Sequence, residues 1–334
     1  MREQGVWALA WRRFRRDRLG LACLIVVALY VAAMLGAAAG WIARDWQEEI
    51  GVSYAPPGFL GPDKLSSAAA APSGQGGAIE DYGVADQLGP DLVAIAKTLS
   101  GAAPDAARAA TLPFGADKWG RDVLRKALKG TQTSLFVGLA AALLATFLGT
   151  LFGAQAGFRG GPVDDFFNWL YSVFTSIPYL LLVLAVAAVV NQKGTLTVIL
   201  ILGLTGWTGI FRLVRAEYLK HKVREYVLAA DAIGASPARR MYVHILPNVS
   251  HVILVQLSLH VVLFIKSEVI LSFLGFGVGV DTVSWGSMLA EAGAELLLGK
   301  WWQLAAATLA MALLVTAFSL FTDALRDALD PRLK

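Results

Sequence analysis

The chain has 334 residues, of which 56% are hydrophobic and only 16% are charged, and its formal net charge is +4. Soluble domains carry about 25% charged residues, so this composition excludes a soluble globular protein and indicates several membrane spans. The basic residues lie at the ends of apolar runs rather than in a separate basic domain, which argues against nucleic acid as a partner.

Residues 1–18 contain six arginines and are followed by an apolar run over residues 19–42. A signal peptide is one interpretation, since Ala37, Ala38 and Ala39 offer small residues like those of a cleavage site. The run is roughly 36 Å long as a helix, however, which is enough to cross a bilayer. We therefore predict a cytoplasmic basic N-terminus at 1–18 and an uncleaved first span at 19–42.

Residues 43–131 are predicted to form an extracytoplasmic segment. Prolines and glycines make residues 44–111 partly irregular, and their role is open between a spacer and a partner-docking surface. Within residues 114–130, Trp119, Leu124 and Leu128 fall on one helical face. This pattern predicts a short helix lying at the outer membrane surface.

The second span is predicted at residues 133–157, where Gly149, Gly153 and Gly157 recur every fourth residue. Small residues at this interval favour close packing of helices in a membrane. Residues 158–165 should form a short cytoplasmic turn. The third span, at 166–190, contains Pro178 near its middle, which predicts a bend that either lines a translocation path or is purely structural.

An outer turn at 191–195 leads to the fourth span, at residues 196–214. Its Thr205 and Thr208 could face an aqueous cavity or bond to neighbouring helices. The fifth span, at 249–273, carries two ionisable residues, Lys266 and Glu268. Residues two apart on a helix point to nearly opposite sides, so the two should not pair. Lys266 is expected near the outer boundary, where either snorkelling or a substrate contact would explain it.

Residues 274–300 are predicted to be the last outer segment, in which 275–279 form a turn and not a nucleotide-binding loop. The sixth span runs from Trp301 to about Thr322, and both chain ends are expected inside. The predicted inner segments hold 17 basic residues, whereas the two short outer segments hold only Lys193 and Lys300. This asymmetry fixes the predicted orientation. We accordingly expect a core at 132–323 and a cytoplasmic tail at 324–334.

The basic loop at residues 212–248 joins the fourth and fifth spans. Its pattern predicts a helix, a tight turn at Gly234 and a second short helix capped by Ser236, with Pro237 at the first position. Leu246 and Pro247 then lead into the next span.

The spacing of Ala229-Ala230, Gly234 and Leu246-Pro247 resembles the signature loop of ABC importer permeases, most closely the dipeptide/oligopeptide type. Leu228 stands where that family usually has Glu, and His244 where it usually has Ile. Two further stretches are similar to the same subgroup. They are the set Gly115, Asp117, Gly120, Arg121 and Asp122, with Ala116 in place of a Thr, and the run from 272 to 292. The resemblance covers residues 114–334, about two thirds of the chain.

This resemblance implies an all-α integral membrane protein with six transmembrane helices and the type I ABC importer permease fold. It implies a second permease subunit, two ATPase domains inside and an extracytoplasmic solute-binding protein, in the cell membrane of a prokaryote. The ATPase-coupling residues would be Leu228, Ala229, Ala230, Asp231, Gly234, Ala235, His244, Leu246 and Pro247. We expect no enzyme activity, cofactor or metal in this chain, because it has neither a phosphate-binding loop nor metal-ligand spacing. ATP and Mg would bind the ATPase partners.

Candidate residues of a translocation path are Ser176, Pro178, Thr205, Thr208 and Glu268. One competing hypothesis is a stand-alone secondary transporter or channel that uses Lys266 and Glu268 as coupling charges, although the chain shows no internal repeat. Another is a membrane scaffold or sensor built on residues 44–111. Nothing in the sequence distinguishes dipeptides, oligopeptides, modified peptides, metal chelates and glycosides as cargo.

Overall fold

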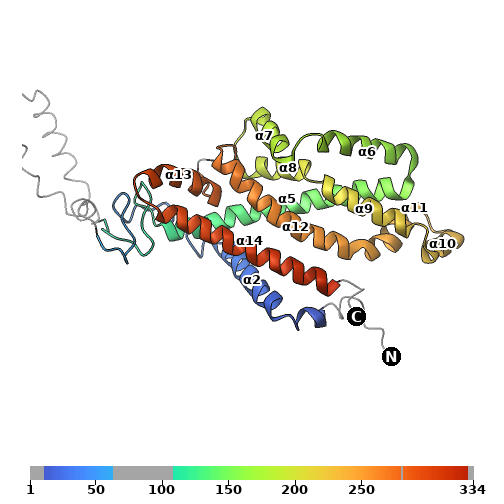
Figure 1. Cartoon of the computed structure of the whole chain (residues 1–334), viewed down its shortest axis with the longest axis horizontal. Helices are drawn as coiled ribbons and strands as arrows, with labels where there is room; N and C mark the ends of the chain where they lie inside the picture. Colours follow the sequence, from blue (N-terminus) through green and yellow to red (C-terminus); the bar gives the residue numbers. More distant parts are fainter. Residues whose placement is uncertain (1–10, 63–107, 280, 330–334) are drawn as a thin grey trace, which may run out of the picture.

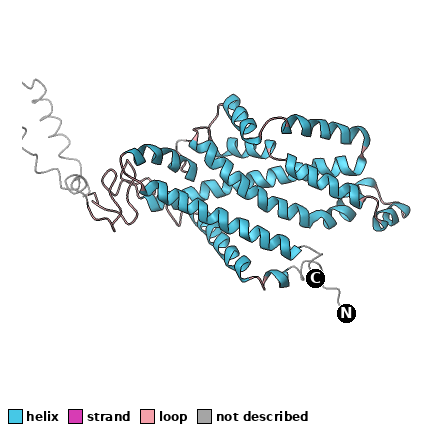
Figure 2. Ribbon diagram, in the orientation of Figure 1, coloured by secondary structure: helices cyan, strands magenta, loops and turns pink. Residues whose placement is uncertain are grey.

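A computed structural model describes residues 11–62, 108–279 and 281–329 (Figure 1). In these ranges the ordered elements are helices joined by loops, with no strand, as Figure 2 shows. The helices are α2 (Arg18–Ala38), α5 (Val123–Arg159), α6 (Gly161–Thr175), α7 (Tyr179–Val190), α8 (Thr195–Thr205), α9 (Thr208–His221), α10 (Glu225–Ala232), α11 (Pro237–Arg239), the π-helical η1 (Arg240–Ile245), α12 (Leu246–Phe273), α13 (Trp285–Leu297) and α14 (Trp302–Leu329). The predicted all-α class is confirmed. Predictions for residues 1–10, 63–107 and 330–334 lie outside the described residues.

Five helical stretches of the described chain are long and apolar enough to cross a membrane, namely Arg18–Ala38, Val123–Arg159, Thr195–His221, Pro237–Phe273 and Trp302–Leu329. The bent pair α6 and α7 makes a sixth if it counts as one span. These six match the predicted spans in order. The segment just before α2 packs against the end of α14, where Phe14 clusters with Ala324 and Ala328, so the two ends of the described helical bundle lie together. The direction in which the chain crosses the membrane stays a prediction.

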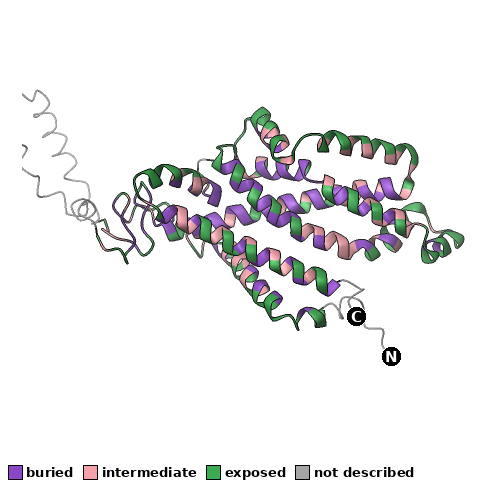
Figure 3. Cartoon of the chain, in the orientation of Figure 1, coloured by how far each residue is buried: buried purple, intermediate pink, exposed green. Residues whose placement is uncertain are grey.

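Helix α5 forms the centre of the bundle and contacts α2, α8, α9, α12, α13 and α14 (Figure 1). Its 37 residues span roughly 55 Å. Figure 3 shows that buried residues gather on α5 and the helices beside it, whereas α6 carries none. The largest apolar cluster of the described residues is therefore built around α5, as expected where helices pack within a membrane bundle.

The predicted glycine face of the second span is confirmed as a packing surface. A Cβ on Gly149 would come within 2.7 Å of the Trp207 carbonyl oxygen, and one on Gly153 within 2.8 Å of the Phe211 carbonyl oxygen. A Cβ on Gly157 would lie 2.6 Å from the Arg215 carbonyl oxygen. The three glycines thus let the backbone of α5 lie directly against that of α9.

Two predicted boundaries are wrong. No separate interfacial helix exists at 114–130, because residues 114–122 form a loop and α5 runs without interruption from Val123 into the second span. The cytoplasmic turn predicted at 158–165 shrinks to Gly160, which separates α5 from α6. Gly160 and Gly161 have φ of +69° and +53°, a conformation that glycine adopts readily, and it allows so abrupt a reversal.

The third span is broken rather than merely bent. Helices α6 and α7 meet at 86° around Pro178, which precedes the first residue of α7. Proline lacks an N–H group and forces the preceding residue out of the helical region, so the predicted bend is confirmed with a larger angle than a kink. The fourth span extends to His221 and the sixth to Leu329, beyond their predicted ends.

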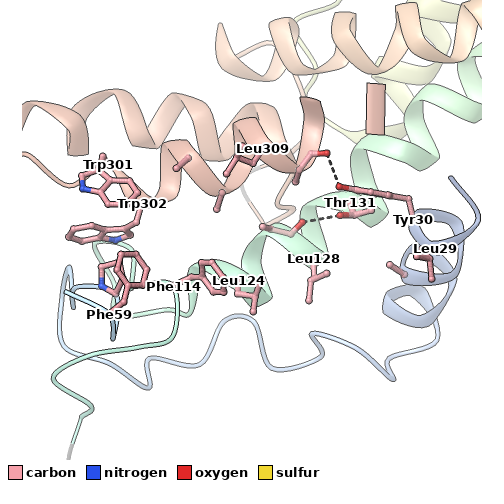
Figure 4. Close-up of a pocket in the computed structure, with 16 residues that line it drawn as sticks. Leu29, Tyr30, Phe59, Phe114, Leu124, Leu128, Thr131, Trp301, Trp302 and Leu309 are labelled. Carbon is pink, nitrogen blue, oxygen red and sulfur yellow. Dashed lines mark hydrogen bonds between the residues drawn. The ribbon is translucent and has the colours of Figure 1, made fainter. Parts of the chain in front are cut away.

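An apolar groove of about 420 Å³ lies between α2, α5 and α14 (Figure 4). Aromatic side chains gather at one end of it, from Phe59, Phe114, Trp301 and Trp302. The two hydroxyl groups in its wall donate hydrogen bonds to carbonyl oxygens, that of Tyr30 to Ala310 on α14 and that of Thr131 to Ala127 one turn earlier on α5. Because these donors are satisfied within the chain, the groove suits a surface that faces hydrocarbon.

Candidate functional site

The predicted signature loop contains helix α10, and α10 ends in a Schellman motif at Gly234. The amide of Gly234 donates to the Asp231 carbonyl oxygen at 2.8 Å, and the amide of Ala235 donates to that of Ala230 at 2.9 Å. Gly234 has φ +83° with open space around its Cα, so the turn requires glycine for conformation and not for packing. The predicted helix and Gly-centred turn are confirmed.

The second half of the loop differs from the prediction. The Ser236 hydroxyl accepts a hydrogen bond from the Arg239 amide, as predicted for a cap. The helix that begins there does not stop, however, but continues through the π-helical η1 into α12 as one stretch from Pro237 to Phe273. A regular helix would bring the Pro247 ring against the carbonyl of the preceding turn, and the wider π turn relieves that clash. The loop is therefore rigidly continuous with the fifth span.

Helix α10 turns one face inward and the other to solvent. Val227 and Ala230 are buried, and Val227 packs in a cluster with Tyr218, Met241 and Ile245. Leu228, Ala229, Asp231 and Gly234 are exposed, Ala235, His244 and Leu246 are half-buried, and Pro247 is exposed. The sequence-predicted residues thus divide into a buried anchor and an exposed surface.

Polar contacts tie the loop to the neighbouring spans. The buried Tyr218 of α9 donates its hydroxyl to the Met241 carbonyl oxygen at 3.1 Å. Arg240 pairs with Asp231 at 2.7 Å, and its guanidinium carbon lies 5.6 Å from the centre of the Phe158 ring. A force applied to α10 would therefore reach α5, α9 and α12 through direct contacts.

The loop exposes large apolar side chains, which we call the coupling patch. The patch consists of Val223, Tyr226, Leu228, Ile233, Tyr242 and Val243. Ile233 is 86% exposed and Leu228 54% exposed. Sequence reasoning singled out only Leu228, and the signal for the others was apolar residues within an otherwise basic loop. An exposed apolar set with a charged border is typical of a protein interaction surface.

The candidate path residues do not form one site. Ser176 and Pro178 are exposed at the break between α6 and α7. Thr205 is buried and donates its hydroxyl to the Ile201 carbonyl oxygen at 2.7 Å, while Thr208 is half-buried near the start of α9. Glu268 is fully buried in α12. Their roles in transport stay predictions.

Lys266 and Glu268 point away from each other, as predicted. Lys266 is exposed, whereas Glu268 accepts a hydrogen bond from the Ser272 hydroxyl at 2.7 Å. Neither residue forms an ion pair recorded among the described residues. This arrangement gives no support to a pair of coupling charges. Across the described ranges, no group of three or more metal-ligating side chains comes together.

The stretch from Gly115 to Asp122 forms a compact loop around one carboxylate. Asp117 Oδ1 accepts hydrogen bonds from the amides of Trp119 at 2.9 Å and Arg121 at 3.0 Å. Gly120 has φ +80°, and a Cβ there would lie 2.0 Å from the Gly51 carbonyl oxygen. Asp122 then caps α5 by accepting from the Leu124 amide at 2.8 Å. The motif therefore positions the N-terminal end of the central helix.

The comparisons with known proteins are consistent with this geometry. Residues 149–334 match the family described as "binding-protein-dependent transport system inner membrane component". Residues 5–57 match the "N-terminal TM domain of oligopeptide transport permease C". The chain is 39% identical over 221 residues to the dipeptide transport system permease protein DppC of Bacillus subtilis, which covers 66% of this chain and 69% of that protein.

The chain belongs to the family of binding-protein-dependent transport system inner membrane components. It is also 38% identical over 221 residues to the oligopeptide permease OppC of Bacillus subtilis, covering 66% of this chain and 72% of the relative. The di/tripeptide permease DppC of Pseudomonas aeruginosa is 34% identical over 221 residues, again 66% of this chain and 72% of the relative.

Membership in this transport family agrees with the multi-pass helical structure and places the protein in the membrane. The family match includes the whole signature loop, and the second match includes α2. The protein is thus a membrane component of an ABC importer, and a stand-alone secondary transporter is not favoured.

Proposed function

We propose that this chain is one permease subunit of an ATP-driven importer of peptides, moved by separate ATPase subunits that dock on the coupling patch. The observation that carries the proposal is the exposed apolar surface on a loop that continues rigidly into a membrane span. The named relatives act in dipeptide, oligopeptide and di/tripeptide transport, which supports peptides as the cargo.

Coupling would work through the contacts already described. When the ATPase subunits close, they displace α10 together with the patch residues Leu228 and Ile233. Tyr218 and the ion pair between Asp231 and Arg240 transmit this displacement to α9 and to the helix that becomes α12. The small residue Ala229 lets the partner approach α10 closely. ATP and Mg belong to those ATPase partners, and this chain binds no cofactor.

The second permease would cover the broken third span. No residue of helix α6 is buried within this chain. Three of its exposed side chains are large and apolar, namely Phe166, Trp169 and Val173. Exposed Leu181 extends this apolar surface onto α7. The break beside it exposes Ser176 and Pro178, so polar and apolar groups meet where two subunits would enclose a path. An extracytoplasmic binding protein would deliver peptide from the opposite side to the coupling loop.

The candidate path residues fall into two groups under this proposal, those that line the path and those that hold the surrounding helices in place. Ser176 and Pro178 would line the path at the break, and Thr208 would lie beside it. Thr205 and Glu268 are buried among the helices of this chain, so they would shape the path by holding those helices in place. Gly234 acts by permitting the turn.

The decisive experiment replaces the most exposed residue of the coupling patch with a charge. In the assembled transporter, Ile233→Asp should reduce co-purification of the ATPase subunits and ATP-dependent uptake of trialanine at least about tenfold. A desolvated charge at an interface core costs several kcal/mol, and about 1.4 kcal/mol already corresponds to tenfold. Leu297→Asp is the matched control, because Leu297 is 89% exposed at the end of α13. Its ATPase co-purification should stay at the wild-type level.

Two outcomes would contradict the proposal. One is normal ATPase association and uptake in the Ile233→Asp transporter. The other is uptake of trialanine that follows an ion gradient without ATP. That result would show that the chain acts as a secondary transporter, driven by the ion gradient and not by ATPase subunits.

A further inference from the structure

A polar cavity of about 480 Å³ is lined in part by α13. Helix α13 lies at the opposite end of the helical bundle from α10 (Figure 1). Its wall comes from the loop before α5, the turn between α7 and α8, the loop between α12 and α13, and α13 itself. Its volume lies in the range of about 300–1,000 Å³ that is typical of small-molecule sites. Two indole rings, of Trp46 and Trp119, and several charged side chains line it.

The cavity carries more positive than negative charge. Lys118, Arg121 and Lys193 line it, and within the described residues none of the three is in a salt bridge. The fourth cation, Lys126, is already neutralised, because it bonds both Asp117 and Glu291. Glu291 also lines the cavity, but it is one of the two partners of Lys126, so three cations remain without a paired anion. This pattern favours an anionic ligand.

Arg121 is held in position before any ligand arrives. Its backbone is fixed on both sides of the loop, since its amide bonds Asp117 Oδ1 and its carbonyl oxygen accepts from the Asp117 amide at 3.1 Å. Its guanidinium carbon lies 5.5 Å from the centre of the Trp46 ring and 5.9 Å from that of Trp119. Its Nε is buried and has no hydrogen-bond partner among the described residues. A guanidinium fixed by stacking presents its donors in the fork that matches a carboxylate.

The lysines are positioned by the surrounding loops. The Gly194 amide donates to the Gly277 carbonyl oxygen at 3.3 Å, which ties the turn carrying Lys193 to the loop between α12 and α13. A Cβ on Gly277 would lie 1.9 Å from the Ser272 hydroxyl oxygen, so this loop fits closely over the end of α12. On the other side, Lys118 Nζ lies 5.3 Å from the centre of the Trp119 ring. The two lysines thus line the same cavity from different segments.

We propose that this cavity binds the free C-terminal carboxylate of a small peptide, with Arg121 as the bidentate partner and Lys118 and Lys193 as supporting cations. The indoles of Trp46 and Trp119 would pack against the adjacent peptide side chain. The proposal rests on the proposed function, because the choice of a peptide carboxylate follows from peptide import. The cavity should therefore prefer a peptide with a free C-terminal carboxylate over the same peptide with an amidated C-terminus, because the amide brings no charge to balance the three cations.

The test measures peptide binding to the assembled transporter in nanodiscs without its binding protein. The probe is benzoylphenylalanyl-alanyl-alanine, a photoreactive tripeptide, compared with its C-terminal amide, and the labelled segment is located by mass spectrometry. We expect the carboxylate form to label the segments around Trp119 and Lys193 about tenfold more than the amide. Arg121→Gln should reduce labelling by the carboxylate form about tenfold, as expected for loss of a charge-assisted pair.

The matched control is Arg108→Gln, because Arg108 is exposed at the same end of the molecule and pairs with Glu49 outside the cavity. The Arg108→Gln transporter should be labelled by the carboxylate form as strongly as the wild type. Arg121→Lys should retain part of the labelling. If Arg121→Gln fails to assemble, the double variant of Lys118→Gln and Lys193→Gln decides, since both side chains are exposed.

Equal labelling by acid and amide would overturn the proposal, and so would unchanged labelling in Arg121→Gln. Loss of binding-protein association in that variant, with tripeptide labelling unchanged, would assign the cations to protein docking instead and would also overturn it. The proposed function fails separately, if the wild-type transporter with its binding protein shows no ATP-dependent uptake of trialanine.

Discussion

Lys126 and Asp117 form an ion pair that is sealed from solvent at the start of the central helix, with Nζ and Oδ2 2.7 Å apart. The same ammonium group bonds Glu291 of α13 and the Gln303 side-chain oxygen of α14, the latter at 3.3 Å. One cation therefore joins the loop before α5 to two helices that follow more than 150 residues later. This end of the molecule is organised by charge, although the spans are organised by apolar packing.

Replacing Lys126 with methionine keeps most of the side-chain volume but leaves Asp117 buried without its cation. Breaking a buried pair in this way costs about 3–5 kcal/mol. We expect a large fall in the thermal unfolding temperature of the purified transporter. Arg108→Met removes the exposed pair with Glu49 and should cost less than about 1 kcal/mol. Similar unfolding temperatures for the two variants would show that the Lys126 cluster contributes little.

Gly153→Leu tests the close approach of α5 and α9. A side chain there must displace the Phe211 carbonyl oxygen and the Val214 Cβ, which lie 2.8 and 2.9 Å from the Cβ position. Both belong to another helix, so α9 has to move and we expect a loss of several kcal/mol or failure to assemble. Gly293→Ala is the control, since the Cβ at this position of α13 meets nothing within 4 Å. Its unfolding temperature should stay equal or rise, because alanine favours helix over glycine by about 1 kcal/mol.

Glu295 of α13 predicts that the stability of the protein depends on pH. Burial raises the pKa of this carboxyl group from 4.5 to about 7, although the nearby Lys126 opposes the shift. Because the folded protein keeps a proton that the unfolded chain releases, stability from this group is full below pH 4.5 and is lost as pH rises to about 7. In the Glu295→Gln variant the side chain cannot ionise, so this loss of stability with rising pH does not occur. Its unfolding temperature should exceed that of the wild type at pH 8 and approach it at pH 4.5.

That comparison has a clear contrary result. If the difference in unfolding temperature between Glu295→Gln and the wild type is the same at pH 4.5 and pH 8, proton binding by Glu295 does not contribute to the pH dependence. Glu49 is the control position, because Glu49→Gln changes an exposed carboxyl group in the same region.

Much of the membrane architecture was predictable from sequence because it depends on short-range rules. Apolar length located the spans, and the four-residue spacing of Gly149, Gly153 and Gly157 identified a packing face before its partner helix was known. The turn at Gly234 and the cap at Ser236 also follow from local backbone chemistry, so both were predicted correctly. Pro178 predicted a bend, but the angle of 86° depends on how α6 and α7 pack.

The helix boundaries around Asp117 and Pro247 were not predictable in the same way. The amphipathic pattern at 114–130 favoured a helix, yet hydrogen bonds to Asp117 and a cap from Asp122 hold its first half as a loop. The continuous helix through Pro247 requires a π-helical turn, which no local preference indicates. In the signature loop, sequence supplied the residue set but not its division into buried and exposed faces.

The sequence by itself determined that this protein is a helical membrane protein with a basic loop that turns at Gly234, because hydropathy and glycine act through neighbouring residues. Only the tertiary structure decided which charges are neutralised. Lys126 is buried and paired, while Arg121, five residues earlier, lines a cavity with its guanidinium near the rings of both Trp46 and Trp119. That difference arises from partners distant in sequence, since a charge is stabilised by whatever the fold brings within a few ångströms of it.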